Sequence, residues 1–132
     1  MLAKTIPFFT TQVQAGFPSQ ADDYLEKNID INDLFQVDEA TSFYVRAVGM
    51  SMKNSGIMPG DILHVRRDLD ARDGDIVIAV IDSEFTVKTF RKKGSCIIFE
   101  ASNEEFPDII PESEQDVQIW GVVTGFARIL RK

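Results

Sequence analysis

The chain has 132 residues, of which 44% are hydrophobic and 27% are charged, and its formal net charge is −7. This composition is typical of a soluble globular protein, and no apolar run approaches the roughly 18–20 residues that a membrane-spanning helix needs. The acidic charge disfavours direct, sequence-specific binding of DNA, because such a chain repels phosphate groups.

Residues 1–40 differ in pattern from the rest of the chain and are predicted to form a separate N-terminal arm. Residues 1–20 have little periodicity and contain two prolines and a glycine, which indicates an extended segment. Acidic residues after a possible cap predict a short helix of about two turns over 21–28. Residues 29–35 alternate apolar and polar side chains at first, which predicts a short strand or an extended connector.

From residue 41 to residue 132, short runs of aromatic and β-branched residues alternate with turn signals, which predicts a β domain. The predicted strands are Ser42–Val48, Ile62–Arg66, Asp75–Ile81, Glu84–Phe90, Cys96–Ala101 and Asp116–Leu130. The continuous apolar run 75–81 predicts that this strand is buried on both faces. In the last strand, Gly121 and Gly125 predict bends or a bulge. The fold class is therefore mostly β, with compact, strongly bent antiparallel sheets.

Ser51 is the first candidate for chemistry, because it follows the point where a predicted strand stops at Gly49. Backbone N–H groups that leave a sheet there can receive an oxyanion, and a serine hydroxyl can reach out as a nucleophile. The alternative is a loop serine without a role, since serine is common in turns.

The usual partner of a nucleophilic serine is a histidine, and the chain contains only His64. It alternates with Leu63 and Val65, which predicts that it lies on the polar face of its strand. The single cysteine, Cys96, excludes an internal disulfide, indicates a cytoplasmic protein and is interpreted as a buried, apolar-like side chain. One histidine and one cysteine cannot complete a zinc site, so no metal or cofactor is expected.

The remaining candidate base is a lysine. A free lysine has a pKa of about 10.4, so it is neutral near pH 7 only where burial lowers that pKa. Lys88 is the best candidate because it lies in the middle of a predicted strand, whereas Lys92 and Lys93 lie in a turn. The alternative is an ordinary exposed lysine on a strand.

Six blocks of sequence follow one another between residues 41 and 125. They are Gly49-Met50-Ser51-Met52, Gly56-Ile57, Pro59-Gly60-Asp61, Asp73-Gly74-Asp75-Ile76-Val77, Phe85-Thr86-Val87-Lys88 and Trp120-Gly121-Val122-Val123. In this order they resemble the LexA/UmuD family of self-cleaving serine peptidases. The resemblance implies the LexA-like C-terminal peptidase fold, with Ser51 as nucleophile and Lys88 as general base. It also implies an oxyanion hole from the backbone N–H groups of Ser51 and Met50.

The family cleaves its own chain upstream of the serine at an Ala-Gly or Cys-Gly bond. The matching bond here is Ala15-Gly16, so cleavage would remove residues 1–15 and leave residues 16–132. Small residues on both sides let the backbone lie close to a nucleophile, and an extended segment can pair with a sheet edge.

Fifteen residues precede Gly16, too few for the helix-turn-helix domain of LexA-type repressors. The arm Gly16-Phe-Pro-Ser-Gln-Ala-Asp-Asp-Tyr-Leu-Glu26 and the following Ile29-Asp30-Ile31 resemble the UmuD branch in particular. This resemblance implies a cytoplasmic homodimer that is an accessory subunit of an error-prone translesion DNA polymerase in the SOS response. The implied partners are a RecA–single-stranded-DNA filament that stimulates cleavage and a UmuC-type Y-family polymerase. Two alternatives stay open, namely a non-catalytic polymerase-binding module on this fold and a signal-peptidase-like Ser-Lys enzyme.

Overall fold

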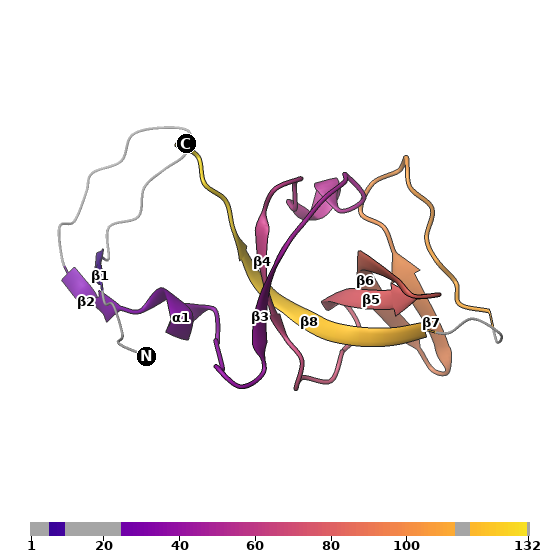
Figure 1. Cartoon of the computed structure of the whole chain (residues 1–132), viewed down its shortest axis with the longest axis horizontal. Helices are drawn as coiled ribbons and strands as arrows, with labels where there is room; N and C mark the ends of the chain where they lie inside the picture. Colours follow the sequence, from indigo (N-terminus) through magenta and orange to yellow (C-terminus); the bar gives the residue numbers. More distant parts are fainter. Residues whose placement is uncertain (1–5, 10–24, 113–116, 132) are drawn as a thin grey trace. The chain divides into compact units, whose positions relative to one another are not determined.

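The computed structural model describes residues 6–9, 25–112 and 117–131. The chain divides into two compact units, Met1–Val37 and Asp38–Lys132 (Figure 1). The expected cleavage bond Ala15-Gly16 lies outside the described residues, as does the first half of the helix predicted over 21–28.

The first unit contains a two-stranded antiparallel sheet of β1 (Ile6–Phe9) and β2 (Leu25–Ile29), in which Ile6 faces Ile29. The helix predicted over 21–28 is therefore wrong for residues 25–28. So short a helix is marginal without outside support, and pairing with β1 satisfies the backbone of this segment instead.

A one-turn helix, α1 (Ile31–Leu34), follows β2. The backbone of Asp30 is extended, and its side chain accepts a hydrogen bond from the N–H of Asn32 at 2.9 Å, as an N-cap does. The predicted strand or connector over 29–35 is thus wrong for residues 31–34, because this cap starts a helix at Ile31. Among the described residues, no helix is both long and apolar enough to span a bilayer.

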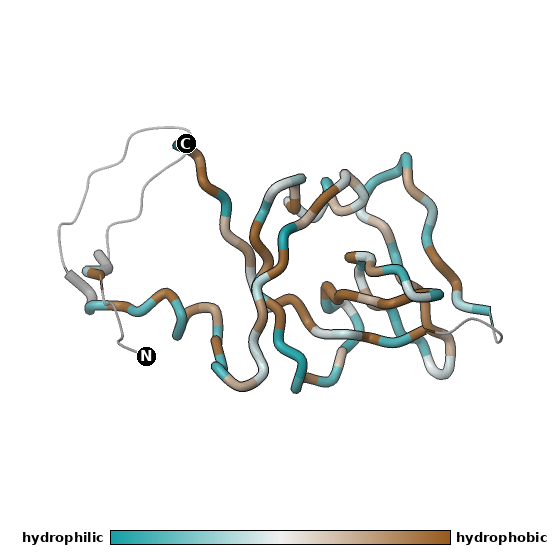
Figure 2. The backbone as a smooth tube through the Cα atoms, viewed as in Figure 1, coloured by the Kyte–Doolittle hydropathy of each residue, from teal (hydrophilic) through white to brown (hydrophobic). Residues whose placement is uncertain are grey.

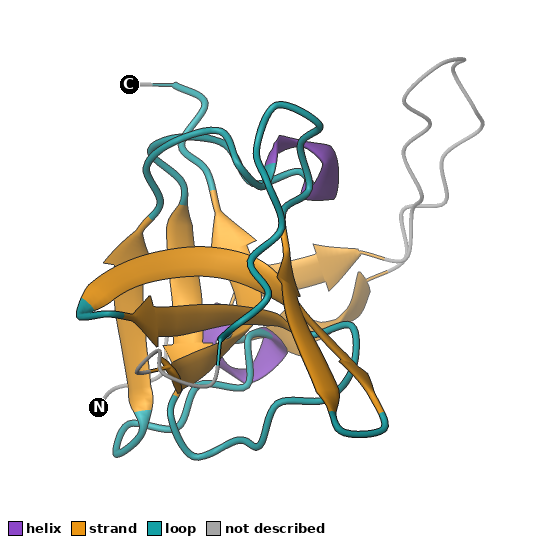
Figure 3. Cartoon of the chain, turned by 90° about the vertical axis from the view of Figure 1, so that its right-hand side faces the viewer, coloured by secondary structure: helices purple, strands orange, loops and turns teal. Residues whose placement is uncertain are grey.

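The second unit is built on one six-stranded antiparallel sheet, which confirms the predicted mostly β fold. Its strands are β3 (Ser42–Arg46), β4 (Ile62–Arg66), β5 (Ile76–Ile81), β6 (Glu84–Lys93), β7 (Cys96–Glu100) and β8 (Val117–Ala127), and a short 3-10 helix, η1, spans Lys53–Ser55. Their order across the sheet is β3-β4-β8-β5-β6-β7. The sheet bends strongly, and the long strand β8, yellow in Figure 1, arcs through its middle (Figures 1 and 3).

Two bulges help β8 to bend, as its glycines predicted. The pairing with β5 steps from Gly121 to Ile119, so Trp120 is an extra residue. The pairing with β4 steps from Gly125 to Val123, so Thr124 is the second extra residue. Each bulged residue therefore lies next to a glycine.

Strand β5 separates two hydrophobic clusters, which confirms the predicted burial on both of its faces. Ile78 packs in one cluster with Leu63 and Val65. Its neighbours Val77 and Ala79 point to the opposite face and pack in the other cluster. Figure 2 shows the apolar residues that run along this strand.

Two side chains lie in surroundings opposite to those predicted. His64 is buried, not on a polar face, because neighbouring strands cover it: its ring packs against Tyr44 of β3, and its Nδ1 hydrogen-bonds the Thr124 hydroxyl in the bulge of β8. Cys96 is exposed, not buried, because it begins β7 at the edge of the sheet. Strand patterns report alternation, whereas burial depends on the side chains that neighbouring strands place beside a residue.

Candidate active site

Ser51 lies in a turn that carries the chain out of the sheet. Gly49 has a φ of +82°, a left-handed conformation that side chains other than glycine rarely adopt. Beyond β3, two further backbone hydrogen bonds tie Ala47 to the segment before β4, from Gly60 N–H and to Asp61 O. The chain is thus held up to residue 47 and then turns sharply, which projects Ser51 at the end of the strand.

Lys88 meets Ser51 from β6. Its Nζ donates a hydrogen bond to Ser51 Oγ at 3.0 Å, across 37 positions of sequence. The lysine is only 6% exposed, and its backbone pairs with Val77 of β5 in the middle of a hairpin. A rigid pair of strands therefore positions the amine beside the hydroxyl.

The pKa of Lys88 is lowered from its ordinary value because burial disfavours the ammonium form. The carboxylate of Asp108 acts in the opposite direction and raises that pKa, but the effect of burial is larger. The amine is therefore neutral at a lower pH than a free lysine, and a neutral amine can accept a proton from a hydroxyl.

A two-residue segment after β7 holds the turn around Ser51. The N–H of Ser102 donates to Ser51 O at 2.7 Å, and Asn54 N–H donates to Ser102 O at 2.7 Å. The amide of Asn103 donates from Nδ2 to Met50 O at 2.8 Å. Sequence reasoning missed these residues, since short polar residues after a strand indicate only a loop.

The backbone N–H groups of Met50 and Ser51 are the oxyanion donors that the family resemblance implies. Within the part of the chain that the structure describes, neither donates to a protein acceptor.

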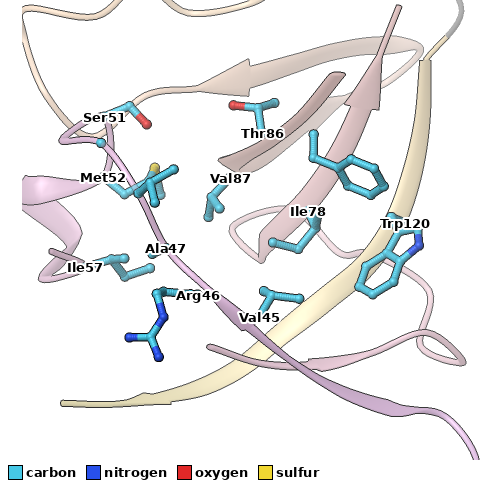
Figure 4. A pocket seen from close by; sticks show the side chains of 13 residues that line it. Val45, Arg46, Ala47, Ser51, Met52, Ile57, Ile78, Thr86, Val87 and Trp120 are labelled. Atoms are coloured by element: carbon cyan, nitrogen blue, oxygen red, sulfur yellow. The ribbon is translucent and has the colours of Figure 1, made fainter. Parts of the chain in front are cut away.

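An apolar cleft of about 420 Å³ begins at Ser51. It is lined by Val45, Arg46, Ala47, Val48, Gly49, Ser51, Met52, Ile57, Ile78, Phe85, Thr86, Val87 and Trp120. In Figure 4, Ser51 and Trp120 lie at opposite ends of the labelled side chains, with Val87 and Ile78 between them. Two segments, 45–49 and 85–87, thus flank the cleft, which suits an extended peptide with small or apolar side chains.

The block Pro59-Gly60-Asp61 stabilises the segment between η1 and β4, next to the site. Asp61 is 1% exposed, and its carboxylate accepts hydrogen bonds from Arg128 Nε at 2.6 Å, Arg128 Nη2 at 2.7 Å and Met58 N–H at 2.8 Å. The guanidinium of Arg128 holds the pKa of Asp61 below its ordinary value. These contacts are structural: they fix the turn that follows η1.

No group of three or more His, Cys, Asp or Glu side chains among the described residues could hold a metal ion. The reactive groups that meet at the site are the Ser51 hydroxyl and the Lys88 amine. In the sequence, Ala15 and Gly16 fall in the connection between β1 and β2, which is not described.

Comparisons with known proteins all indicate one peptidase family. The Peptidase S24-like family matches residues 7–124. The protein SamA of Salmonella typhimurium is 43% identical over 122 residues, which cover 92% of this chain and 84% of SamA. The protein ImpA of Escherichia coli is 42% identical over 119 residues, covering 89% of this chain and 80% of ImpA. A LexA repressor of Haemophilus influenzae is 39% identical over 120 residues, which cover 89% of this chain but 57% of the repressor.

Proposed function

The chain belongs to the Peptidase S24-like family, and we propose that it is a serine peptidase that cleaves its own Ala15-Gly16 bond. The observation that carries the proposal is the 3.0 Å hydrogen bond between Lys88 Nζ and Ser51 Oγ at the end of an apolar cleft. A buried amine whose pKa is lowered is the base that a serine needs where no histidine is at hand.

In the proposed reaction, neutral Lys88 takes the proton of the Ser51 hydroxyl as Oγ attacks the carbonyl carbon of Ala15. The carbonyl oxygen becomes an oxyanion, which the N–H groups of Ser51 and Met50 stabilise. The C–N bond then breaks, and the Lys88 ammonium gives its proton to the amine of Gly16. Water, deprotonated by Lys88, then hydrolyses the ester between Ser51 Oγ and the carbonyl carbon of Ala15 and restores Ser51.

The cleft favours the proposed substrate. Ala15 has a small apolar side chain, of the kind that an apolar cleft between the segments 45–49 and 85–87 would accept, and Gly16 offers no side chain to obstruct the nucleophile. The extended backbone around the bond can pair with a flanking segment of the cleft, which would align the carbonyl with Ser51 Oγ.

Incubation of the full chain at alkaline pH tests the proposal, because deprotonation of Lys88 should start the reaction. Mass spectrometry should detect a fragment that begins at Gly16. Ser51→Ala and Lys88→Ala should each slow its appearance by at least about 100-fold, the low end for loss of an acid–base group. Lys92→Ala is the matched control, because the structure places Lys92 on β6 with Lys88, not in the predicted turn, and leaves it exposed. The cleavage rate of this variant should equal the parent's. Cleavage of either dyad variant at the parent rate would refute the assignment.

The wider role we propose is that of an accessory subunit of an error-prone translesion polymerase in the SOS response. Residues 16–132 would be the active form, a homodimer that binds a UmuC-type Y-family polymerase, and a RecA–single-stranded-DNA filament would stimulate cleavage. The support is the resemblance of the arm, residues 16–26 and 29–31, to the UmuD branch of the family. Light scattering, cleavage assays with RecA filaments and a polymerase pull-down test these partners. A chain that binds the polymerase but never cleaves would instead be a non-catalytic binding module.

A further inference from the structure

The carbonyl oxygen of Met50 accepts two hydrogen bonds. One comes from the N–H of Lys53 at 3.1 Å, within the turn itself. The other comes from Asn103 Nδ2 at 2.8 Å, across 53 positions of sequence. This oxygen belongs to the same peptide group as the N–H of Ser51, so its partners act on the nucleophile's own amide.

Peptide geometry makes that link strict. A trans peptide is planar, and its C=O and N–H point in opposite directions. The described residues contain no cis peptide bond. Anchoring Met50 O toward Lys53 and Asn103 therefore fixes the opposite direction for the N–H of Ser51. Hydrogen bonds to the carbonyl also polarise the peptide, which strengthens its N–H as a donor.

Asn103 is itself held at both ends of its amide. Its Oδ1 accepts a hydrogen bond from the N–H of Glu105 at 3.0 Å, while its Nδ2 donates to Met50 O. The first contact requires an oxygen and the second a nitrogen, so only one orientation of the amide satisfies both. The side chain is 8% exposed, which shields these bonds from competing water.

We propose that Asn103 is a positioning residue that aims the Ser51 N–H at the oxyanion, an inference that rests on the proposed peptidase function. Asn103 acts through the Met50–Ser51 peptide and does not touch the reacting atoms. Its loss should lower the limiting rate of self-cleavage, reached at alkaline pH where Lys88 is neutral. It should leave the pH midpoint in place if the variant adds no charge, because the base is unaltered.

The test measures the rate of appearance of the Gly16 fragment against pH for the full chain and two variants. Asn103→Leu removes both hydrogen bonds without adding charge. Asn103→Asp keeps an oxygen for Glu105 N–H and loses the donor to Met50 O, so it separates the two contacts. Both variants should lower the limiting rate by about 10- to 100-fold, the scale for a misaimed oxyanion donor. The ¹H–¹⁵N signal of Ser51 should shift in both.

Thr41→Ala is the matched control, because it also removes one side-chain hydrogen bond, to Asp68, outside the site. Its limiting rate should equal the parent's. If Asn103→Asp cleaves at the limiting rate of the parent, the inference is wrong but the proposed peptidase stands. The same holds if Asn103→Leu shifts the pH midpoint without lowering the limiting rate. Cleavage by Ser51→Ala, or none by the parent, would overturn the peptidase and the inference together.

Discussion

Gly121→Ala should destabilise the β domain sharply, because no room exists for a methyl group. A Cβ there would lie 2.4 Å from Val65 Cγ1 and 3.1 Å from Arg66 O. Ordinary contact begins near 3.4 Å, so Val65 would have to retreat by about 1 Å. Val65 is fully buried, and a β-branched side chain has little rotamer freedom. Overpacking of this kind costs about 2–3 kcal/mol of unfolding free energy.

Urea unfolding measures this cost, with the fluorescence of Trp120 as the signal. Trp120 is the only tryptophan of the chain, lies next to Gly121 and lines the cleft. The midpoint should fall by about 1–2 M urea, if the free energy of unfolding depends on urea concentration as it does in other small domains. The emission spectrum of the folded variant should shift as well, because the bulge that places Trp120 moves.

Two further variants isolate the cause of the loss. Gly60→Ala has open space but a φ of +92°, so its cost is backbone strain alone, about 1 kcal/mol. Val65→Ala should relieve the clash, so the double variant should be more stable than the sum of the single changes by about 1 kcal/mol or more. A loss under about 0.5 kcal/mol for Gly121→Ala, or strict additivity, would contradict the packing argument.

Two pH dependences follow from the charged groups of the site and its support. Asp108→Asn keeps the oxygen that accepts the Ala101 N–H but removes the charge that raises the pKa of Lys88. Self-cleavage at pH 7 should therefore accelerate, while the limiting rate at alkaline pH stays the same. Equal rates of the variant and the parent at pH 7 and low salt would count against this. Asp61 has a lowered pKa, so its stabilising effect is present above its ordinary value of 3.8 and is lost as the pH falls through the lower, folded-state pKa. Thermal melts should therefore show Asp61→Asn less stable than the parent at pH 7 and less sensitive to acid, and parallel curves would exclude that linkage.

Local sequence was sufficient for much of the β domain. The hairpin between β5 and β6 and the bulges beside Gly121 and Gly125 follow from turn signals, apolar runs and glycine placement. These features are decided by neighbouring residues, so periodicity reveals them. The pattern of strands and turns also made Ser51 and Lys88 candidates, but their roles as nucleophile and base came from the family resemblance.

Long-range pairing decided the rest. Residues 25–28 form a strand because β1 lies beside them, and His64 is buried because Tyr44 and Thr124 of the two neighbouring strands pack against it. Cys96 is exposed because it begins the edge strand β7. In the sequence, nothing distinguishes Asn103 from other loop residues, whereas the fold places its amide in hydrogen-bonding contact with Met50 O.

Within the β domain, the sequence by itself determined where most strands and turns occur, and which serine and lysine to consider. Only the tertiary structure decided that the lysine is buried, that its amine lies 3.0 Å from the hydroxyl and that a distant asparagine holds the serine's peptide. The reason is physical: strand patterns depend on adjacent residues, whereas desolvation and hydrogen-bond geometry depend on groups that meet only when the sheet assembles.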